Sequence, residues 1–208
     1  MKVGMIGLGA MGTGMARNAA KAGYLTGVYN RTTAKAQSLA QELVVTAYDQ
    51  PEQLSANVDV VLMCVSADSD VLSVVNSIAQ TIKAGSVVVD MSTVSRDTAK
   101  KAAACLFKKQ VAFLDAPVSG GVEGAKNASL AMMVGGDSQA LEKVRPVLEA
   151  MTRSIIHIGP NGTGQATKAV NQIMAAGINQ AVTEALAFAE AQGLPMAKVI
   201  EVISGGAS

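Results

Sequence analysis

The chain has 208 residues, of which half are hydrophobic and 16% are charged, and its 17 basic and 16 acidic residues give a net charge of +1. This length fits one large domain, or one domain with part of a second, and the composition allows a sizeable core. The near-neutral balance, without a basic run, argues against a nucleic-acid partner. No stretch approaches the ~20 apolar residues that cross a bilayer, and the N-terminus does not resemble a secretory signal. We therefore expect a soluble, cytoplasmic protein with no membrane partner.

The two cysteines do not predict a metal site. Cys64 lies in an apolar, strand-like run, whereas Cys105 lies in a helix-like stretch. Their spacing matches neither a metal-binding pattern nor a CxxC pair. Two reduced, buried thiols are expected, and no metal ligands.

Strand-like and helix-like stretches alternate along residues 1–160. The strand-like runs are rich in Val and Met without polar alternation, as in a parallel sheet that is covered on both faces. Such an alternation predicts a doubly wound, Rossmann-type α/β domain over residues 1–160, with a mostly parallel sheet. The expected strands are Val3–Ile6, Leu25–Tyr29, Val58–Val65, Ser86–Met91, Val111–Leu114, Leu130–Val134 and Ile155–Ile158. The expected helices are Ala10–Ala22, Thr33–Leu43, Asp68–Ile82, Ser95–Lys108 and Ser138–Met151.

A glycine-rich turn separates the first expected strand from the first expected helix. It reads G-x-G-x-x-G and consists of Gly7, Leu8, Gly9, Ala10, Met11 and Gly12. In a dinucleotide-binding unit the first glycine allows the tight turn, the second lets a pyrophosphate approach, and the third lets helix and strand pack closely. Backbone N–H groups at the helix N-terminus then face the phosphates. The motif alone is weak, because a glycine-rich turn can exist without a ligand.

The second expected strand ends at Asn30, Arg31 and Thr32, where the adenosine ribose of a bound dinucleotide should lie. NAD-selective sites usually place Asp or Glu there, but Asn30 is neutral. The guanidinium of Arg31 can hold a 2′-phosphate with two hydrogen bonds. NADP is therefore favoured over NAD, although Arg31 could also be an ordinary solvated turn residue.

Further cofactor contacts are expected where later strands end. Val65 and Ser66 follow the third strand, and Ser92 and Thr93 follow the fourth. Ligands of open α/β sheets bind in the crevice at these carboxyl ends. The hydroxyl groups could instead cap the next helix, as we expect of Ser95.

The stretch Asp115–Gly121 follows a strand and has no hydrophobic periodicity. The hydroxyl of Ser119 and the N–H groups of Gly120 and Gly121 can form an anion-binding concavity that suits a substrate carboxylate. A plain turn would use the same residues.

A long Ala-rich helix, Gln165–Gln192, follows the last expected strand, and a further helix is expected at Met196–Ile203. These predict the start of an all-helical C-terminal domain over residues 161–208. Because the chain stops at Gly-Gly-Ala-Ser, this domain is expected to be incomplete, and the chain to be the front part of a longer protein.

Lys168 is the most informative residue of the long helix. Asn171 and Gln172 share its helix face, so the three side chains can converge on one small molecule. Desolvation lowers the pKa of a lysine towards the range useful for proton exchange with an alcohol or carbonyl oxygen. The alternative is a lysine whose amine extends into solvent.

Three spaced motifs together resemble the β-hydroxyacid dehydrogenase family. They are the glycine turn, Asp-Ala-Pro-Val-Ser-Gly-Gly at 115–121, and G-x-G-x-x-x-K-x-x-N at 162–171. This family includes 3-hydroxyisobutyrate dehydrogenase, tartronate semialdehyde reductase, and succinic and glyoxylic semialdehyde reductases. The resemblance covers the whole chain in order.

The resemblance implies an oxidoreductase that transfers hydride between NADP(H) and a short β-hydroxyacid or its semialdehyde. It implies that Lys168 is the catalytic acid/base, that Ser119, Gly120 and Gly121 hold the substrate carboxylate, and that Asn171 orients the substrate, with Gln172 beside it. The glycine turn, Asn30–Thr32 and Thr93 would bind NADP. Family members are commonly dimers or tetramers, and their helical domain closes the active site.

Other functions remain open at this point. 6-Phosphogluconate dehydrogenase is related in fold, but Asp115–Val118 and the Asn171–Gln172 pair fit it poorly. Lys168 fits an imine reductase poorly. A non-catalytic NADP-binding module for oligomerisation or redox sensing is the alternative from a different class. His157 is expected to be structural.

Overall fold

A computed structural model describes residues 1–206 of the chain. Its contacts divide the chain into two compact units, Met1–Lys168 and a unit that begins at Ala169. The predicted domain division after residue 160 stays a prediction. The predicted second domain, 161–208, ends with two residues, 207 and 208, that lie outside the described part.

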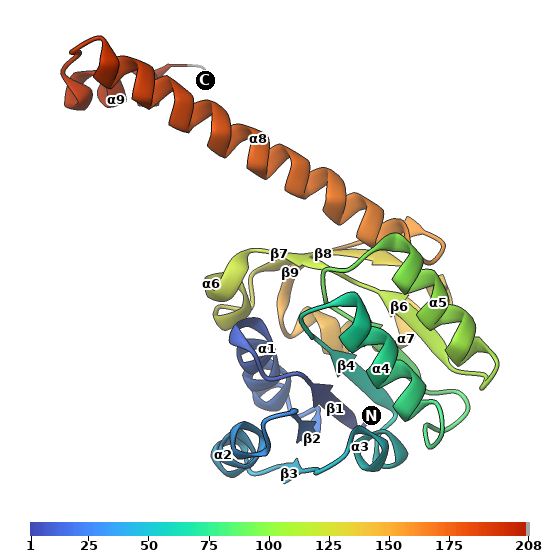
Figure 1. Cartoon of the computed structure of the whole chain (residues 1–208). Coiled ribbons are helices and arrows are strands. Elements are labelled where there is room, and N and C mark those ends of the chain that lie inside the picture. Colours follow the sequence, from blue (N-terminus) through green and yellow to red (C-terminus); the bar gives the residue numbers. More distant parts are fainter. Residues whose placement is uncertain (207–208) are drawn as a thin grey trace. The chain divides into compact units, whose positions relative to one another are not determined.

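The first unit contains a nine-stranded sheet (Figure 1). Its strands are β1 (Val3–Ile6), β2 (Leu25–Tyr29), β3 (Thr46–Ala47), β4 (Val60–Met63), β5 (Val87–Asp90), β6 (Ala112–Asp115), β7 (Val118–Ser119), β8 (Leu130–Gly135) and β9 (Thr152–Gly159). The order β3-β2-β1-β4-β5-β6 is parallel throughout. Strand β8 pairs antiparallel with β6 and β7, and parallel with β9. The chain thus winds outward from β1 in both directions, which confirms the predicted doubly wound, mostly parallel fold.

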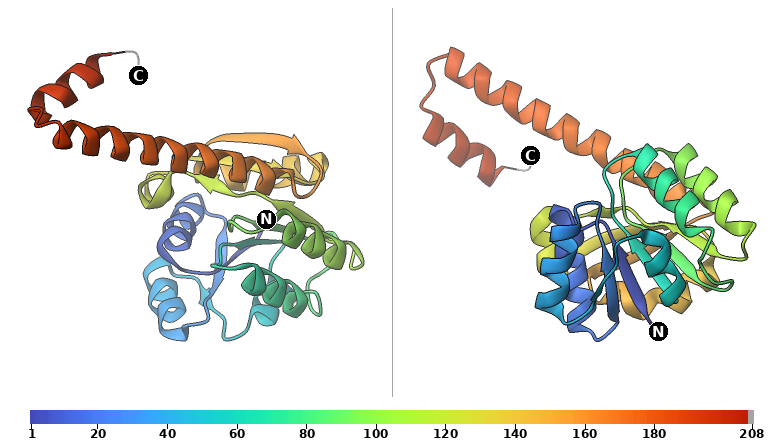
Figure 2. Two further views of the ribbon diagram at one scale, coloured as in Figure 1. Left: turned by 45° about the horizontal axis from the view of Figure 1, so that its top comes forward. Right: turned by 60° about the horizontal axis from the view of Figure 1, so that its bottom comes forward.

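Helices cover both faces of this sheet (Figure 2). They are α1 (Ala10–Lys21), α2 (Thr33–Leu43), α3 (Pro51–Asn57), α4 (Asp68–Ile78), α5 (Arg96–Phe107), α6 (Gly121–Lys126) and α7 (Ser138–Glu149). Successive side chains of a strand point to opposite faces. Accordingly Val60 and Leu62 of β4 pack with α1, α2 and α7, whereas Val61 and Met63 pack with α3, α4 and α5. All four side chains are fully buried, which explains the strand's lack of polar alternation.

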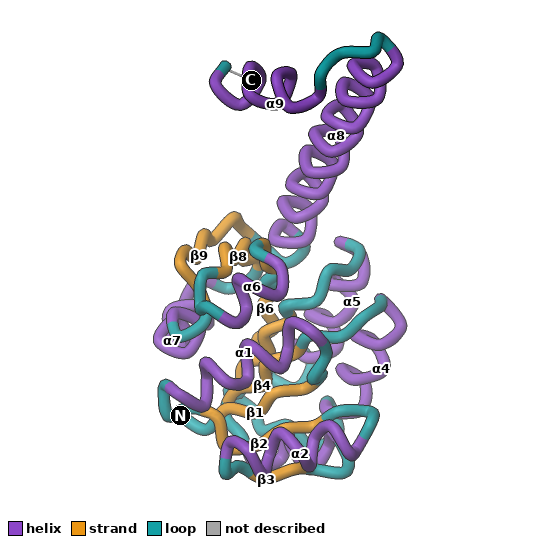
Figure 3. Tube along the Cα trace, turned by 90° about the vertical axis from the view of Figure 1, so that its left-hand side faces the viewer, coloured by secondary structure: helices purple, strands orange, loops and turns teal. Residues whose placement is uncertain are grey.

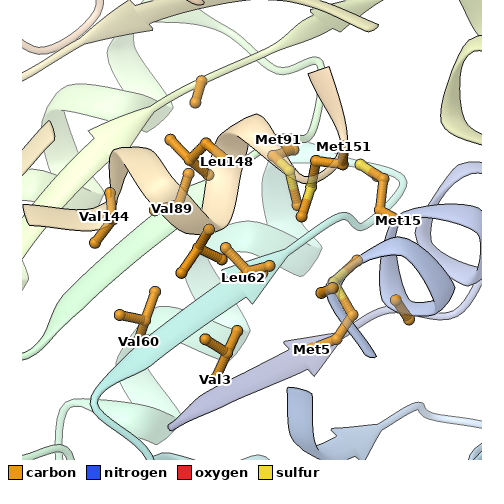
Figure 4. Close-up of a cluster of buried hydrophobic side chains, with 14 of the residues drawn as sticks. Val3, Met5, Met15, Val60, Leu62, Val89, Met91, Val144, Leu148 and Met151 are labelled. Carbon is orange, nitrogen blue, oxygen red and sulfur yellow. The ribbon is translucent and has the colours of Figure 1, made fainter. Parts of the chain in front are cut away.

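Methionines fill much of the core that aromatic residues would occupy in other proteins. Met15 of α1, Met91 after β5 and Met151 after α7 converge in Figure 4, and each is at most 2% exposed. Met5 of β1 lies below them beside Leu62. The flexible thioether side chain adapts to irregular gaps, and burying one such side chain stabilises the fold by about 1.5–3 kcal/mol.

Several elements differ from those expected. Four short ones, β3, α3, β7 and α6, were not predicted, because two-residue strands and helices of six or seven residues leave too little periodicity to detect. Strand β4 ends at Met63 rather than Val65. The backbone N–H of Val65 donates instead to Oγ of Ser92 at 2.9 Å, so it takes no part in the sheet.

Helix α6 packs directly against α1. A Cβ on Gly14 would lie 3.0 Å from the backbone of Ala125, so a larger residue would require the two helices to move apart by a few tenths of an ångström. The side-chain amide of Asn18 donates to the carbonyl of Ala125 at 2.7 Å. The end of α6 is therefore fixed to the middle of α1.

The chain continues through two consecutive helices, α8 (Thr163–Ala191) and α9 (Met196–Gly205) (Figure 3). Gly193 joins them in a left-handed conformation, with a φ of +67°. The start of α8 belongs to the first unit and the rest to the second. Within residues 1–206, no helix combines the length and the hydropathy that crossing a membrane requires.

Candidate functional site

The three motif glycines occupy three different environments. Gly7 has a φ of +91°, and a Cβ there would collide with the carbonyl of Cys64. A Cβ on Gly12 would collide with the carbonyl of Gly7, whereas one on Gly9 would meet nothing within 4 Å. The first glycine thus makes the tight turn, the third allows close packing of α1, and the second leaves the backbone open to a ligand.

Asn30 connects this turn to the end of β2. Its Oδ1 accepts the backbone N–H of Leu8 at 2.9 Å, and its Nδ2 donates to the carbonyl of Thr32 at 3.2 Å. The neutral amide that replaces the acidic residue of NAD-selective sites therefore also holds the glycine turn in place.

A cavity of about 400 Å³ lies over the turn and brings together residues from four loops. Of the predicted cofactor residues, Gly7, Leu8, Gly9, Asn30, Arg31, Thr32, Val65 and Ser66 line it. Ala10 lines two neighbouring cavities instead. Met11 and Gly12 lie behind the turn, half-buried and buried, and Thr93 is exposed on the loop after β5.

Lys35 and Asp70 also line this cavity, and the sequence analysis did not single them out. Lys35 lies in the first turn of α2, where the helix dipole disfavours a cation. This unfavourable position could have marked Lys35 as a candidate for binding an anionic ligand. Asp70 of α4 forms an ion pair with Arg31, with 3.3 Å between Nη1 and Oδ1. The side chain of Arg31 is 86% exposed, so this pair contributes little to stability and leaves the guanidinium available.

Ser92 organises the neighbouring strand ends. Its Oγ accepts the N–H of Val65, and its own N–H donates to Oδ1 of Asp90 at 3.0 Å. Ser95 accepts the N–H of Thr98 at 3.1 Å and caps α5, which confirms the predicted cap. The hydroxyl groups of Ser92 and Ser95, which follow β5, therefore stabilise the local backbone by accepting its N–H groups.

Two buried carboxyl groups lie at the ends of β5 and β6. Burial raises the pKa of Asp90 to about 6, against the effect of its hydrogen bonds to Ser92. Burial also raises the pKa of Asp115, although backbone N–H groups of Gly162 and Gln165 stabilise its charged form. The Cys64 thiol nearby has its pKa raised to about 12 by burial and by Asp90, which makes it unreactive.

Asp115 fixes the beginning of α8. Its Oδ1 accepts the N–H of Gly162 at 2.7 Å, and its Oδ2 accepts the N–H of Gln165 at 3.0 Å. The carboxylate thereby satisfies N–H groups that a helix start leaves unpaired. Nothing in the local sequence could reveal this cap, because its acceptor lies in a different strand.

Lys168 follows one turn later, at the end of the first unit. The residue is only 8% exposed, and burial lowers the pKa of its amine. This agrees with the desolvation expected from the sequence rather than with an amine extended into water. Asn171 and Gln172 belong to the second unit, so their convergence with Lys168 stays a prediction.

The predicted carboxylate-binding residues form the link between β7 and α6. Gly120 has a φ of +134°, and a Cβ there would lie 3.2 Å from the side chain of Leu130. Gly121, with a φ of +62°, begins α6. Both positions favour glycine for backbone reasons, so their role towards a substrate stays a prediction. His157 contacts the carbonyl of Gly136 through Nε2 at 2.8 Å, which fits a structural role.

Comparison with known proteins identifies the family. Residues 2–159 match the NAD-binding domain of 6-phosphogluconate dehydrogenase, and residues 162–208 match the family described as NAD-binding of NADP-dependent 3-hydroxyisobutyrate dehydrogenase. The chain is 36% identical to an NAD-dependent L-serine dehydrogenase of Pseudomonas aeruginosa, over 99% of its own length and 70% of the relative. It is also 36% identical to the 2-hydroxy-3-oxopropionate reductase of Escherichia coli, over 99% of its length and 71% of that enzyme.

A solved structure shows the same fold. The 3-hydroxyisobutyrate dehydrogenase of Mycobacterium tuberculosis, described with L-serine, is 34% identical, with a TM-score of 0.93. The alignment covers 99% of this chain and 70% of that one. The glycine turn, the loops at the carboxyl edge of the sheet and the buried lysine are all present in order. The chain therefore belongs to the β-hydroxyacid dehydrogenase family of NAD(P)-binding oxidoreductases.

Proposed function

We propose that the protein transfers hydride between NADP(H) and a short β-hydroxyacid or its semialdehyde, with Lys168 as the general acid/base. The observation that carries this proposal is the burial of Lys168, which lowers the pKa of its amine. Asp115 fixes the start of its helix at the carboxyl edge of the sheet, where ligands of this fold class bind.

The residues over the glycine turn fit a dinucleotide. Gly9 leaves open space above the start of α1, and within residues 1–206 no side chain caps that helix. Its backbone N–H groups are thus available to a pyrophosphate. The cavity continues to Arg31, Thr32 and Lys35, two of them cations, and no carboxylate occupies the position of Asn30. Arg31 and Lys35 thus outnumber the carboxylate of Asp70 in this cavity, and this charge distribution supports NADP over NAD.

The proposed roles on the substrate side follow the family resemblance. Ser119, Gly120 and Gly121 would bind the carboxylate, and Asn171 and Gln172 would orient the rest of the molecule. A bound nicotinamide supplies or accepts the hydride at the carbon that is oxidised or reduced. Lys168 donates a proton to the carbonyl oxygen during reduction and removes it from the hydroxyl during oxidation. A lowered pKa suits both directions, because it brings the amine closer to the range in which it both donates and accepts a proton readily.

The test is turnover with a panel of short acids. The protein is mixed with NADPH and each of several semialdehydes, and the absorbance of NADPH is followed. We expect turnover with at least one short acid that carries an aldehyde or ketone group β to its carboxylate. Tight NADPH binding with no turnover of any substrate would instead favour the non-catalytic NADP-binding module.

The family resemblance also supports a dimer or tetramer, which light scattering on the purified chain would test.

A further inference from the structure

The side chain of Gln165 is buried between two segments that are far apart in the sequence. It is 3% exposed. Its Nε2 donates to the carbonyl of Ser92 at 2.7 Å, and its Oε1 accepts the N–H of Val94 at 3.2 Å. Its own backbone N–H donates to Asp115. One residue of α8 is thus held by the ends of both β5 and β6.

These bonds connect two parts of the proposed site. Ser92 and Val94 flank Thr93, which is expected to contact the cofactor. Lys168 lies three residues after Gln165, on the same face of α8. The loop expected at the cofactor and the helix turn that carries the amine are therefore joined through a single side chain.

The chemistry of the contact calls for an amide. It needs one donor for the carbonyl of Ser92 and one acceptor for the N–H of Val94, and glutamine supplies both at once. A carboxylate could accept from Val94 but would set an anionic oxygen against the carbonyl of Ser92. A protonated carboxyl group could again satisfy both partners.

We infer that Gln165 is a positioning residue that fixes the Lys168 amine relative to the Ser92–Val94 loop. This inference rests on the proposed role of Lys168. Gln165 itself exchanges no proton and acts only through the geometry of Lys168. Errors of about 1 Å in the placement of a catalytic group can reduce the rate by about 100-fold.

The experiment compares two substitutions of Gln165 with a matched control. Gln165→Met keeps the length of the side chain but removes both hydrogen bonds. Gln165→Glu restores them only where its buried carboxyl group is protonated, and burial near Asp90 and Asp115 raises the pKa of such a group. Gln53→Glu makes the same change at an exposed position of α3. Thermal unfolding at each pH verifies that the variants are folded at the assay temperature.

We expect Gln165→Met to lower kcat by about 10- to 100-fold at every pH, with KM for NADPH changed less than about threefold. Gln165→Glu should show the same loss at pH 8 and regain much of it at pH 6, relative to the wild-type protein. Gln53→Glu should match the wild type throughout. An unchanged kcat in Gln165→Met, or a loss equal in size to the loss of folded protein, would overturn the inference.

A second readout does not require turnover. The rate at which acetic anhydride modifies the Lys168 amine, followed by mass spectrometry against pH, reports the pKa and accessibility of that amine. Gln165→Met should raise this pKa towards the ordinary lysine value, whereas Gln53→Glu should leave it unchanged. If the wild-type protein turns over no substrate but this shift occurs, the proposed function fails and the positioning role stands. If the shift is absent, the positioning role fails.

Discussion

Asp90 and Asp115 face each other directly across β5 and β6, at the same register position of the sheet. Both are fully buried, yet their environments differ. Each oxygen of Asp115 accepts a backbone N–H from the start of α8. Among the residues that the structure describes, Oδ2 of Asp90 has no hydrogen-bond partner. The sheet therefore holds one carboxylate that is stabilised by α8 and a second that is poorly solvated.

This difference predicts a pH dependence of stability. The pKa of Asp90 is about 6 in the folded protein, against about 3.9 for an aspartate in an unfolded chain. Between these values the folded state binds more protons than the unfolded state, so the free energy of unfolding falls as the pH rises from 4 to 6, and this contribution is constant above that range. Asp90→Asn removes the titration, so its stability relative to wild type should rise by about 1–3 kcal/mol between pH 4 and pH 7.

Urea unfolding at pH 4.5, 5.5 and 7 measures this difference. Asp49→Asn, at an exposed position, is the matched control and should show no such trend. A difference between Asp90→Asn and wild type that stays constant with pH would contradict the assignment.

Lys168→Ala tests the chemical step. General acid/base catalysis contributes about 10²–10⁴-fold, so kcat should fall by at least about 100-fold. The affinity for NADPH should change little, because Lys168 lies outside the cavity over the glycine turn. Steady-state kinetics and fluorescence titration with NADPH measure the two quantities. Lys101→Ala, at an exposed position of α5, should behave as wild type, and a Lys168 variant with most of its activity would defeat the proposed role.

Arg31→Ala tests the preference for NADP. Loss of a charge-assisted contact to the 2′-phosphate should weaken NADPH binding by about 10-fold, while the affinity for NADH stays within a factor of about two. High salt should reduce the difference between wild type and variant, because the guanidinium is exposed. Lys83→Ala, exposed and remote from the cavity, is the control. An equal loss of affinity for NADPH and NADH would show that Arg31 does not bind the 2′-phosphate.

The glycine turn allows stability and binding to be separated. Gly9→Ala introduces a methyl group into open space, so the protein should keep its melting temperature and lose affinity for NADPH. Gly12→Ala forces a methyl group against the carbonyl of Gly7 and should cost about 1–3 kcal/mol of stability. Melting temperatures and NADPH titrations of both variants provide the measurement. Similar melting temperatures would refute the distinct roles assigned to the two glycines.

The parts of the fold that were predictable depend on local patterns. The apolar strands β1, β4 and β5 are each visible in a short window, as is the glycine turn, because burial of a strand on both faces leaves a continuous apolar run. The antiparallel pairing of β8 with β6 was not predictable. Its run of residues looks like the parallel strands, and only the pairing partner sets its direction.

The same limit applies to the site. Lys168 could be singled out because no other charged residue occurs in its helix before Glu184, which is visible in the sequence. The contacts that place it were not visible, because Gln165 bonds to residues 71 and 73 positions earlier in the chain. Asn30 was expected near the ribose, but its bond to Leu8, which holds the glycine turn, depends on the close approach of β1 and β2.

The packing of α6 on α1 at Gly14 and Ala125 has one further consequence. Helix α1 starts at the turn proposed for the pyrophosphate, and α6 starts at the glycines proposed for the carboxylate. The spacing between these two proposed anchoring points thus depends on a contact that includes none of the residues proposed to bind either ligand. A larger side chain at Gly14 would change the distance between the proposed pyrophosphate and carboxylate sites while leaving every proposed ligand-binding group intact.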